Sequence, residues 1–132
     1  MRRAVLDASA AISFFEDRPG AEKVENLLAE GFAGRAELLM SVVNWGEFYY
    51  SEWRARGLKA AQKMAAEISQ FPIQIVSADF NLTKSAAELH AEFNLPYADC
   101  FAAALSKSWK AQLVTADHDF SRVASEINIL FL

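Results

Sequence analysis

The chain has 132 residues, of which 53% are hydrophobic, and its formal net charge is -4. This length and composition predict one compact domain over residues 1–132. The acidic balance excludes the global basic field that DNA-binding modules carry, so any contact with a nucleic acid would depend on a local patch.

A single cysteine, Cys100, excludes an internal disulfide and suits a reducing compartment. The longest uncharged run, residues 68–78, is too short to span a bilayer. Asp7 and Glu16 interrupt the segment that would have to be apolar in a signal peptide. We therefore expect a soluble, cytoplasmic protein that does not enter a membrane.

The predicted elements alternate between strands and helices. The apolar residues 4–6 predict a buried strand that ends at Asp7, and residues 8–15 predict the helix that follows it. An amphipathic helix at 21–30 should end at Gly31, and a short strand at 37–40 comes next.

Ser41 is a good N-cap for a helix at residues 42–56, with Gly57 as its end. Further helices are expected at 58–70, at about 80–93 after a cap at Asp79 or Ser77, and at 97–110. Strands are expected at 73–76, 112–115 and 128–131, with a short helix around 120–124. This alternation indicates an α/β fold with a mainly parallel sheet of four to five strands, covered by helices on both faces.

Two of the strands deliver a carboxylate at their carboxyl ends, Asp7 and Asp117. Ligands bind at that edge in open parallel sheets, so the two carboxylates would share a crevice if their strands are neighbours. Each candidate acid also has an ordinary explanation when taken alone. Asp7 could cap a helix, Asp99 could favour the positive end of its helix, Glu47 could be a solvated charge, and Asp117 or Asp119 could cap the last helix.

Taken together, the acids point to a cation. Glu47 and Asp99 lie in apolar sequence, and no Lys or Arg lies within one helical turn of Asp99 on its own helix. A buried carboxylate without a partner is costly, so a positive charge is expected nearby. Oxygen ligands without a paired His or Cys select Mg2+ or Mn2+ over zinc. One or two such ions could activate a water for phosphodiester hydrolysis.

Four motifs, in this order, resemble those of the PIN-domain ribonucleases: Val5-Leu6-Asp7-Ala8-Ser9, Asn44-Trp45-Gly46-Glu47, Tyr97-Ala98-Asp99 and Leu113-Val114-Thr115-Ala116-Asp117. The length is most similar to that of the VapC toxins of toxin-antitoxin pairs. The resemblance covers essentially the whole chain and implies an α/β/α sandwich. It also implies an endoribonuclease dependent on Mg2+ or Mn2+, usually a homodimer, that a cognate antitoxin inhibits.

The resemblance also implies roles for single residues. The acids around the metal would be Asp7, Glu47, Asp99 and Asp117, with Asp119 as a possible fifth. Ser9 and Thr115 would contact the water shell of the metal or the phosphate, and Asn44 would organise the turn that carries Glu47. Whether Asp117 or Asp119 lies nearer to the metal stays open, with Asp117 favoured.

Two other functions remain open. One is a non-catalytic PIN-like binding module that acts through a protein partner. The other is a different Mg2+ phosphohydrolase, although Asp7-Ala8-Ser9 lacks the Asp-x-Asp arrangement of aspartyl-phosphate phosphatases. The sequence does not identify the RNA that a nuclease of this kind would cut.

Three groups of residues beyond the acids could contact a ligand. The cations Arg54, Arg56, Lys59 and Lys63 could touch RNA phosphates or simply be solvated. The aromatic residues beside Glu47 cannot all point inward, so some could form a protein interface or stack on a base; they are Trp45, Tyr49, Tyr50 and Trp53. His118 lies between two candidate acids and could contact a substrate.

Overall fold

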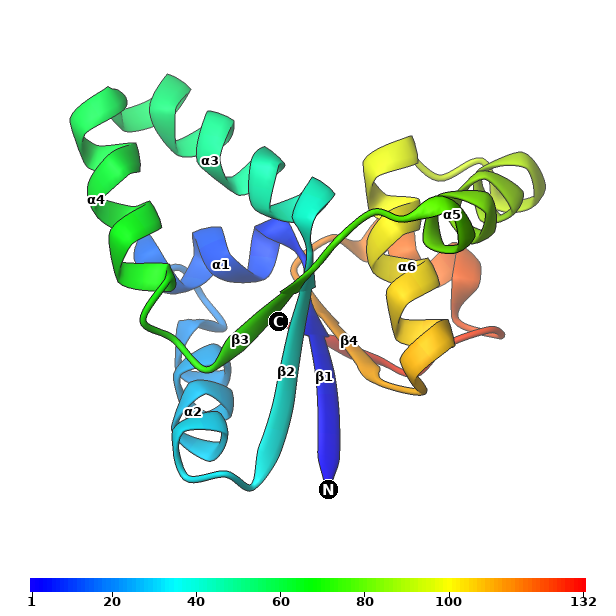
Figure 1. Ribbon diagram of the computed structural model, residues 1–132, viewed down its shortest axis with the longest axis horizontal. Helices are drawn as coiled ribbons and strands as arrows, with labels where there is room; N and C mark the ends of the chain where they lie inside the picture. Colours follow the sequence, from blue (N-terminus) through cyan, green and yellow to red (C-terminus); the bar gives the residue numbers. More distant parts are fainter.

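The computed structural model describes all 132 residues, which form a five-stranded sheet with every neighbouring pair of strands parallel (Figure 1). The strands are β1 (Arg2–Leu6), β2 (Ala36–Ser41), β3 (Ile73–Val76), β4 (Gln112–Thr115) and β5 (Ile129–Phe131). Their order in the sheet is β3-β2-β1-β4-β5. Strands β1 and β4, which precede Asp7 and Asp117, are therefore neighbours at the centre of the sheet.

Helices cover both faces of this sheet. They are α1 (Ala8–Phe15), α2 (Ala21–Phe32), α3 (Val42–Arg56), α4 (Leu58–Ile68), α5 (Phe80–Phe93), α6 (Tyr97–Trp109) and the 3-10 helix η1 (His118–Val123). Successive strand residues point to opposite faces. Ala4 and Leu6 of β1 accordingly pack in one apolar cluster with α1 and α2, whereas Val5 packs in a second cluster with α5 and α6. The predicted α/β/α sandwich with a parallel sheet is confirmed.

The structure confirms that α3 and α5 have the N-caps predicted for them, because a cap depends only on neighbouring residues. Ser41 caps α3 by accepting a hydrogen bond from the Val43 backbone, and the helix ends at Gly57. Asp79, rather than Ser77, caps α5 through a 2.8 Å bond from the Leu82 backbone.

The expected end of α2 at Gly31 is wrong, because the helix continues to Phe32. A Cβ atom at Gly31 would lie 2.8 Å from Cγ of Pro72 and 2.9 Å from Cδ1 of Leu38. Glycine is therefore required here for the close approach of the helix to the chain around β2 and β3, and it does not stop the helix.

Other element ends also differ from the sequence-based expectation. Helix α4 ends at Ile68 instead of residue 70, where the chain turns toward β3. The helix expected at 120–124 is a 3-10 helix that begins at His118, because the Asp117 side chain accepts a 2.9 Å bond from the Asp119 backbone. No helix has both the length and the apolar sequence needed to cross a bilayer.

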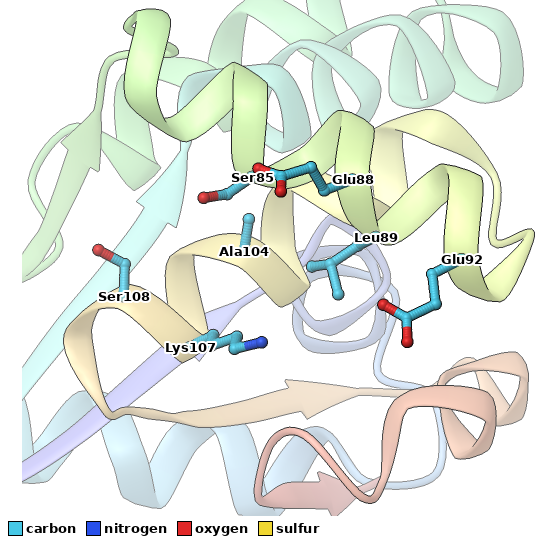
Figure 2. A pocket seen from close by; sticks show the side chains of 7 residues that line it. All are labelled: Ser85, Glu88, Leu89, Glu92, Ala104, Lys107 and Ser108. Atoms are coloured by element: carbon cyan, nitrogen blue, oxygen red, sulfur yellow. The ribbon is translucent and has the colours of Figure 1, made fainter.

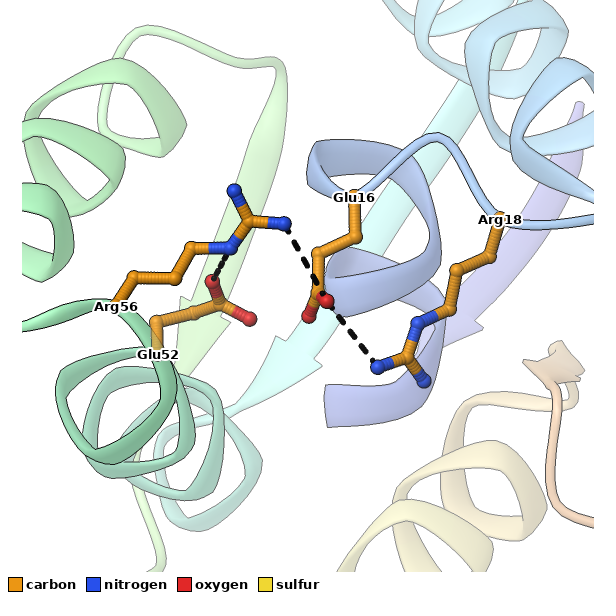
Figure 3. Close-up of polar contacts among 4 residues, drawn as sticks. All are labelled: Glu16, Arg18, Glu52 and Arg56. Atoms are coloured by element: carbon orange, nitrogen blue, oxygen red, sulfur yellow. Dashed lines mark hydrogen bonds and ion pairs between the residues drawn. The ribbon is translucent and has the colours of Figure 1, made fainter.

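A polar junction connects the end of α1 to the C-terminal part of α3 (Figure 3). Oε1 of Glu16 lies 3.2 Å from Nη2 of Arg18 and 3.4 Å from Nη2 of Arg56, and Nε of Arg56 lies 3.5 Å from Oε2 of Glu52. Glu52 is only 1% exposed. Burial, and then the neighbouring Glu16 carboxylate, raise the pKa of Glu52 to about 7. Glu52 is therefore the carboxyl of this junction that holds a proton near neutral pH.

Replacing Glu52 with Gln should stabilise the protein at about pH 8 and have little effect at about pH 5. Because the pKa of Glu52 in the folded protein lies above its ordinary value of 4.5, its contribution to stability is present at low pH and is lost as the pH rises through about 7. The amide removes that loss and keeps a hydrogen-bond donor toward Glu16. We expect a gain of roughly 1 kcal/mol in the free energy of unfolding at the higher pH.

Urea denaturation at both pH values measures this gain, with Glu67→Gln at an exposed position as the control. A gain of the same size at both pH values would contradict the role assigned to the ionisation of Glu52.

Candidate active site

Asp7 lies at the carboxyl end of β1, where three donors fix its side chain. Oδ1 accepts hydrogen bonds from the Ala10 backbone at 2.9 Å and from Oγ of Ser9 at 2.7 Å, and Oδ2 accepts one from Oγ1 of Thr115 at 2.6 Å. The residue is 4% exposed. Asp7 is thus the N-cap of α1, as its ordinary explanation required, and it is also bonded to β4.

The hydroxyl groups of Ser9 and Thr115 hold the loop after β4 as well as Asp7. Oγ of Ser9 accepts a bond from the Ala116 backbone at 2.9 Å, and Oγ1 of Thr115 accepts one from the Asp117 backbone at 3.0 Å. Each hydroxyl has a single proton, and both protons are directed to Asp7. These side chains therefore position the two carboxylates that follow β1 and β4.

Asn44 connects the first turn of α3 to the first turn of α6. Its Nδ2 donates to Oε1 of Glu47 at 2.8 Å and to the carbonyl oxygen of Ala98 at 3.1 Å. The side chain is fully buried, and its Oδ1 has no hydrogen-bond partner. Because Ala98 precedes Asp99, this amide sets the position of Glu47 relative to Asp99.

The electrostatics of Asp99 show that each of the other four candidate acids lies close enough to raise its pKa. Asp99 is half-buried in the first turn of α6. Burial raises the pKa of Asp99 to about 7, with further contributions from the charges of Asp117, Glu47, Asp7 and Asp119. Burial also raises the pKa of Asp7 to about 6, against the effect of its hydrogen bonds. The structure therefore gathers all five acids at the carboxyl edge of the sheet.

No basic side chain neutralises this group of acids. None of the six ion pairs in the chain includes Asp7, Glu47, Asp99, Asp117 or Asp119. With the free Oδ1 of Asn44, the edge has more hydrogen-bond acceptors than donors. The positive partner that the sequence led us to expect is not supplied by the chain itself.

The donor set fits a hydrated hard cation better than a closed metal cage. No group of three or more His, Cys, Asp or Glu side chains has the geometry to hold an ion as the side chains stand. Mg2+ typically takes one or two protein carboxylates and completes its octahedron with water and phosphate oxygens. Structural zinc sites, in contrast, need four converging ligands.

His118, which lies between two candidate acids in the sequence, packs against β5 in the structure. The exposed His118 ring stacks on Phe131, with 4.8 Å between ring centroids and 8° between ring planes.

An open pocket of about 380 Å³ lies between α5 and α6 (Figure 2). Its lining includes Glu88, Glu92 and Lys107 but none of the five acids.

Sequence reasoning missed the carbonyl of Ala98 and the buried junction at Glu52. The spacing of Asn44 and Glu47, three residues apart on one helix, was the available sign of their contact. Nothing local indicates that Glu52 is buried, because its partner Glu16 belongs to a distant turn.

The chain has an open parallel α/β sheet with acids gathered at its carboxyl edge. In proteins of this class, ligands bind at that edge. The sequence profile of the PIN domain matches residues 4–126, and the chain belongs to the PIN domain family. No curated protein sequence matches the chain.

Several solved structures share this fold at low sequence identity. VapBC2 from Rickettsia felis, bound to a DNA fragment from its promoter, has a TM-score of 0.78 and 16% identity and covers 97% of each chain. DNA-bound VapBC from Salmonella typhimurium has a TM-score of 0.75 and 15% identity over 98% of each chain. VapC20 from Mycobacterium tuberculosis, a toxin that cleaves the sarcin-ricin loop, has a TM-score of 0.72 and 18% identity, covering 94% of this chain and 95% of its own.

Replacing Asp99 with Asn should stabilise the metal-free protein at about pH 8. The pKa of Asp99 is raised in the folded protein, so its contribution to stability is lost as the pH rises through about 7. An uncharged isostere removes the burial penalty and the repulsion, and we expect a gain of roughly 1 kcal/mol in the free energy of unfolding.

The gain is measured by urea denaturation in the presence of a chelator, with Glu25→Gln on the exposed face of α2 as the control. Destabilisation by Asp99→Asn at this pH would show that the acids do not repel one another as described.

Proposed function

We propose that this chain is a metal-dependent endoribonuclease, the toxin of a type II toxin-antitoxin pair. The observation that carries the proposal is the gathering of five acids at one edge with no cation from the chain. An uncompensated cluster of this kind would repel an RNA phosphate. A bound Mg2+ or Mn2+ removes this conflict, because the same ion attracts the carboxylates and the phosphate.

In this proposal Asp7, Glu47, Asp99 and Asp117 hold the ion and its water, and Asp119 is a fifth acid at the rim. When bound, the ion supplies a water of lowered pKa and stabilises charge on the phosphate. The contribution of the chain is to keep its oxygen atoms in place beforehand. Ser9 and Thr115 do this for Asp7, and Asn44 does it for Glu47.

Asp7→Asn and Asp99→Asn should each reduce RNA cleavage at least 100-fold, and a chelator should do the same. Each amide removes a negative charge from the site and leaves the size of the side chain unchanged. The measurement is incubation of purified, antitoxin-free protein with total cellular RNA, with and without Mg2+ or Mn2+, and mapping of the new 5' ends by sequencing. Glu25→Gln is the control for substitution at an exposed acid.

Cleavage that survives the chelator and both substitutions would refute the metal-dependent mechanism. If the folded protein cuts no RNA with either metal, the non-catalytic binding module becomes the better account.

The affinity for Mn2+ or Mg2+ should increase as the pH rises from about 6 to about 8. The metal competes with protons, because the pKa of Asp99 is about 7 and that of Asp7 about 6 in the metal-free protein. Each proton released can tighten binding by up to about 10-fold per pH unit below the pKa of its carboxyl group, so the affinity should level off above the pKa of Asp99. Titration calorimetry in two buffers of different ionisation enthalpy measures both the affinity for the metal and the number of protons released. Binding without proton release would contradict this expectation.

The proposed partner is a cognate antitoxin that covers the acids of the free toxin. Among the structures that share this fold, one from Klebsiella pneumoniae is described as a toxin-antitoxin complex, and one from Mycobacterium tuberculosis as a member of the VapBC family of toxin-antitoxin systems. An arginine from the partner would suit the site, because its five donors match an edge rich in unpaired acceptors. A homodimer in the cytoplasm is proposed from the resemblance to the VapC toxins. The RNA target is left to the cleavage experiment.

A further inference from the structure

We infer that Tyr50 and Arg54 on α3 form a subsite for the single-stranded RNA that flanks the scissile phosphate, with Tyr50 stacking on a base and Arg54 contacting a phosphate. The inference rests on the proposed ribonuclease function and adds to it a binding surface outside the acids. It concerns an exposed part of the helix that carries Glu47.

Glu47, Tyr50 and Arg54 lie on one face of α3. At about 100° per residue, Tyr50 is displaced by about 60° and Arg54 by about 20° from Glu47 around the helix. At a rise of about 1.5 Å per residue, they lie about 4.5 Å and about 10.5 Å further along the axis. A strand that places a phosphate near Glu47 would reach both residues within about three nucleotides, at the roughly 3.4 Å step of stacked bases.

The opposite face of α3 is fixed against the rest of the protein. Phe48 is fully buried and stacks on Phe15 of α1, and Glu52 is buried in the junction with Glu16. Tyr50 is turned away from these contacts and is 47% exposed. Helix α3 begins beside α6 at the sheet edge and runs away from it toward α4 (Figure 1). This surface is open to a long, flexible ligand.

Arg54 is distinguished from every other arginine by its lack of polar partners. Of the seven arginines, four pair with carboxylates, and Arg2 and Arg122 donate to Gln112 and to the Asn94 carbonyl. The Arg54 guanidinium instead lies 5.0 Å from the centroid of the Tyr50 ring. This stacking orders the guanidinium and leaves its donors free for an anion.

The local charge favours RNA as the occupant. Lys59 and Lys63, just beyond the end of α3, are exposed and form no ion pair, although the whole chain carries a net charge of -4. Proteins that bind single-stranded nucleic acids combine such cations with aromatic rings on which bases stack. The surface is continuous with Glu47, so the substrate itself is the ligand that would reach both.

The test measures binding of a fluorescently labelled single-stranded RNA of about 12 nucleotides by anisotropy, with Mg2+ and in the Asp7→Asn background, so that the RNA is not cut. In this background Tyr50→Ala should weaken binding by about 5- to 30-fold, in line with the loss of one stacking contact, and Arg54→Gln by a similar factor, because it removes a phosphate contact. Tyr50→Trp should keep the affinity. Arg54→Gln should also lower the salt dependence of binding by about 0.7 in the logarithmic slope, the loss of one phosphate contact to a single strand.

Two matched variants separate this subsite from general surface effects. Trp53 is 48% exposed on the same helix but lies about 120° around the axis from Glu47, and Lys110 is an exposed cation before β4, at the opposite edge of the sheet. Trp53→Ala and Lys110→Gln should change RNA affinity less than about 2-fold. A mononucleotide, which cannot extend from the acids to Tyr50, should show no difference between the wild type and the Tyr50 and Arg54 variants.

Equal losses in the control variants, or unchanged RNA affinity in the Tyr50→Ala and Arg54→Gln variants, would overturn the inference. Loss of antitoxin binding with intact RNA binding would assign the surface to the protein partner and would also overturn it. The two proposals can fail separately. Localised RNA binding without any cleavage would support the subsite and refute the nuclease, whereas cleavage with unchanged KM in both variants would retain the nuclease and refute the subsite.

Discussion

The hydrogen bonds from Ser9 and Thr115 to Asp7 fasten the centre of the sheet to the loop that carries Asp117. We call this set of hydrogen bonds the β1–β4 seam. The geometry of the site depends on it, because β1 and β4 are adjacent and it joins Asp7, which follows β1, to the loop that follows β4. The same Asp7 begins α1, so one carboxylate ends a strand, starts a helix and faces the other acids. Replacing Asp7 with Ala would therefore alter the charge of the site and also remove a helix cap worth about 1 kcal/mol, whereas Asn changes the charge and keeps a capping oxygen.

The second half of the site is built differently. Glu47 comes from the second turn of α3 and Asp99 from the first turn of α6, and the buried amide of Asn44 is the polar link between the starts of these two helices. The acids are thus assembled from two rigid pieces, the β1–β4 seam and the α3–α6 pair. The apolar packing around these two pieces holds the acids together despite their mutual repulsion. Such perturbed, uncompensated charges are common at functional sites.

Sequence reasoning identified those features that depend on neighbouring residues. The bounds of α1, α3 and β4 and the cap at Ser41 follow from local patterns and were correct, and of the two caps considered for α5 the structure has Asp79. The order of the strands was beyond reach, because it depends on pairing between distant segments. Gly31 was misjudged for the same reason: the atoms that require glycine belong to Leu38 and Pro72. The acids could be proposed as a group from their motifs, but their lack of a basic partner is a property of the folded chain.

The raised pKa values of Asp7, Glu52 and Asp99 have a common consequence for the free protein. All three carboxyl groups are easier to bury when protonated, so the metal-free chain is favoured in mildly acidic solution. The cation binding that we propose would require the opposite state and would be favoured above neutrality. Storage and function would then call for different buffers: slightly acidic solution favours the folded, metal-free protein, and a higher pH puts the acids in the charged form that a cation would need.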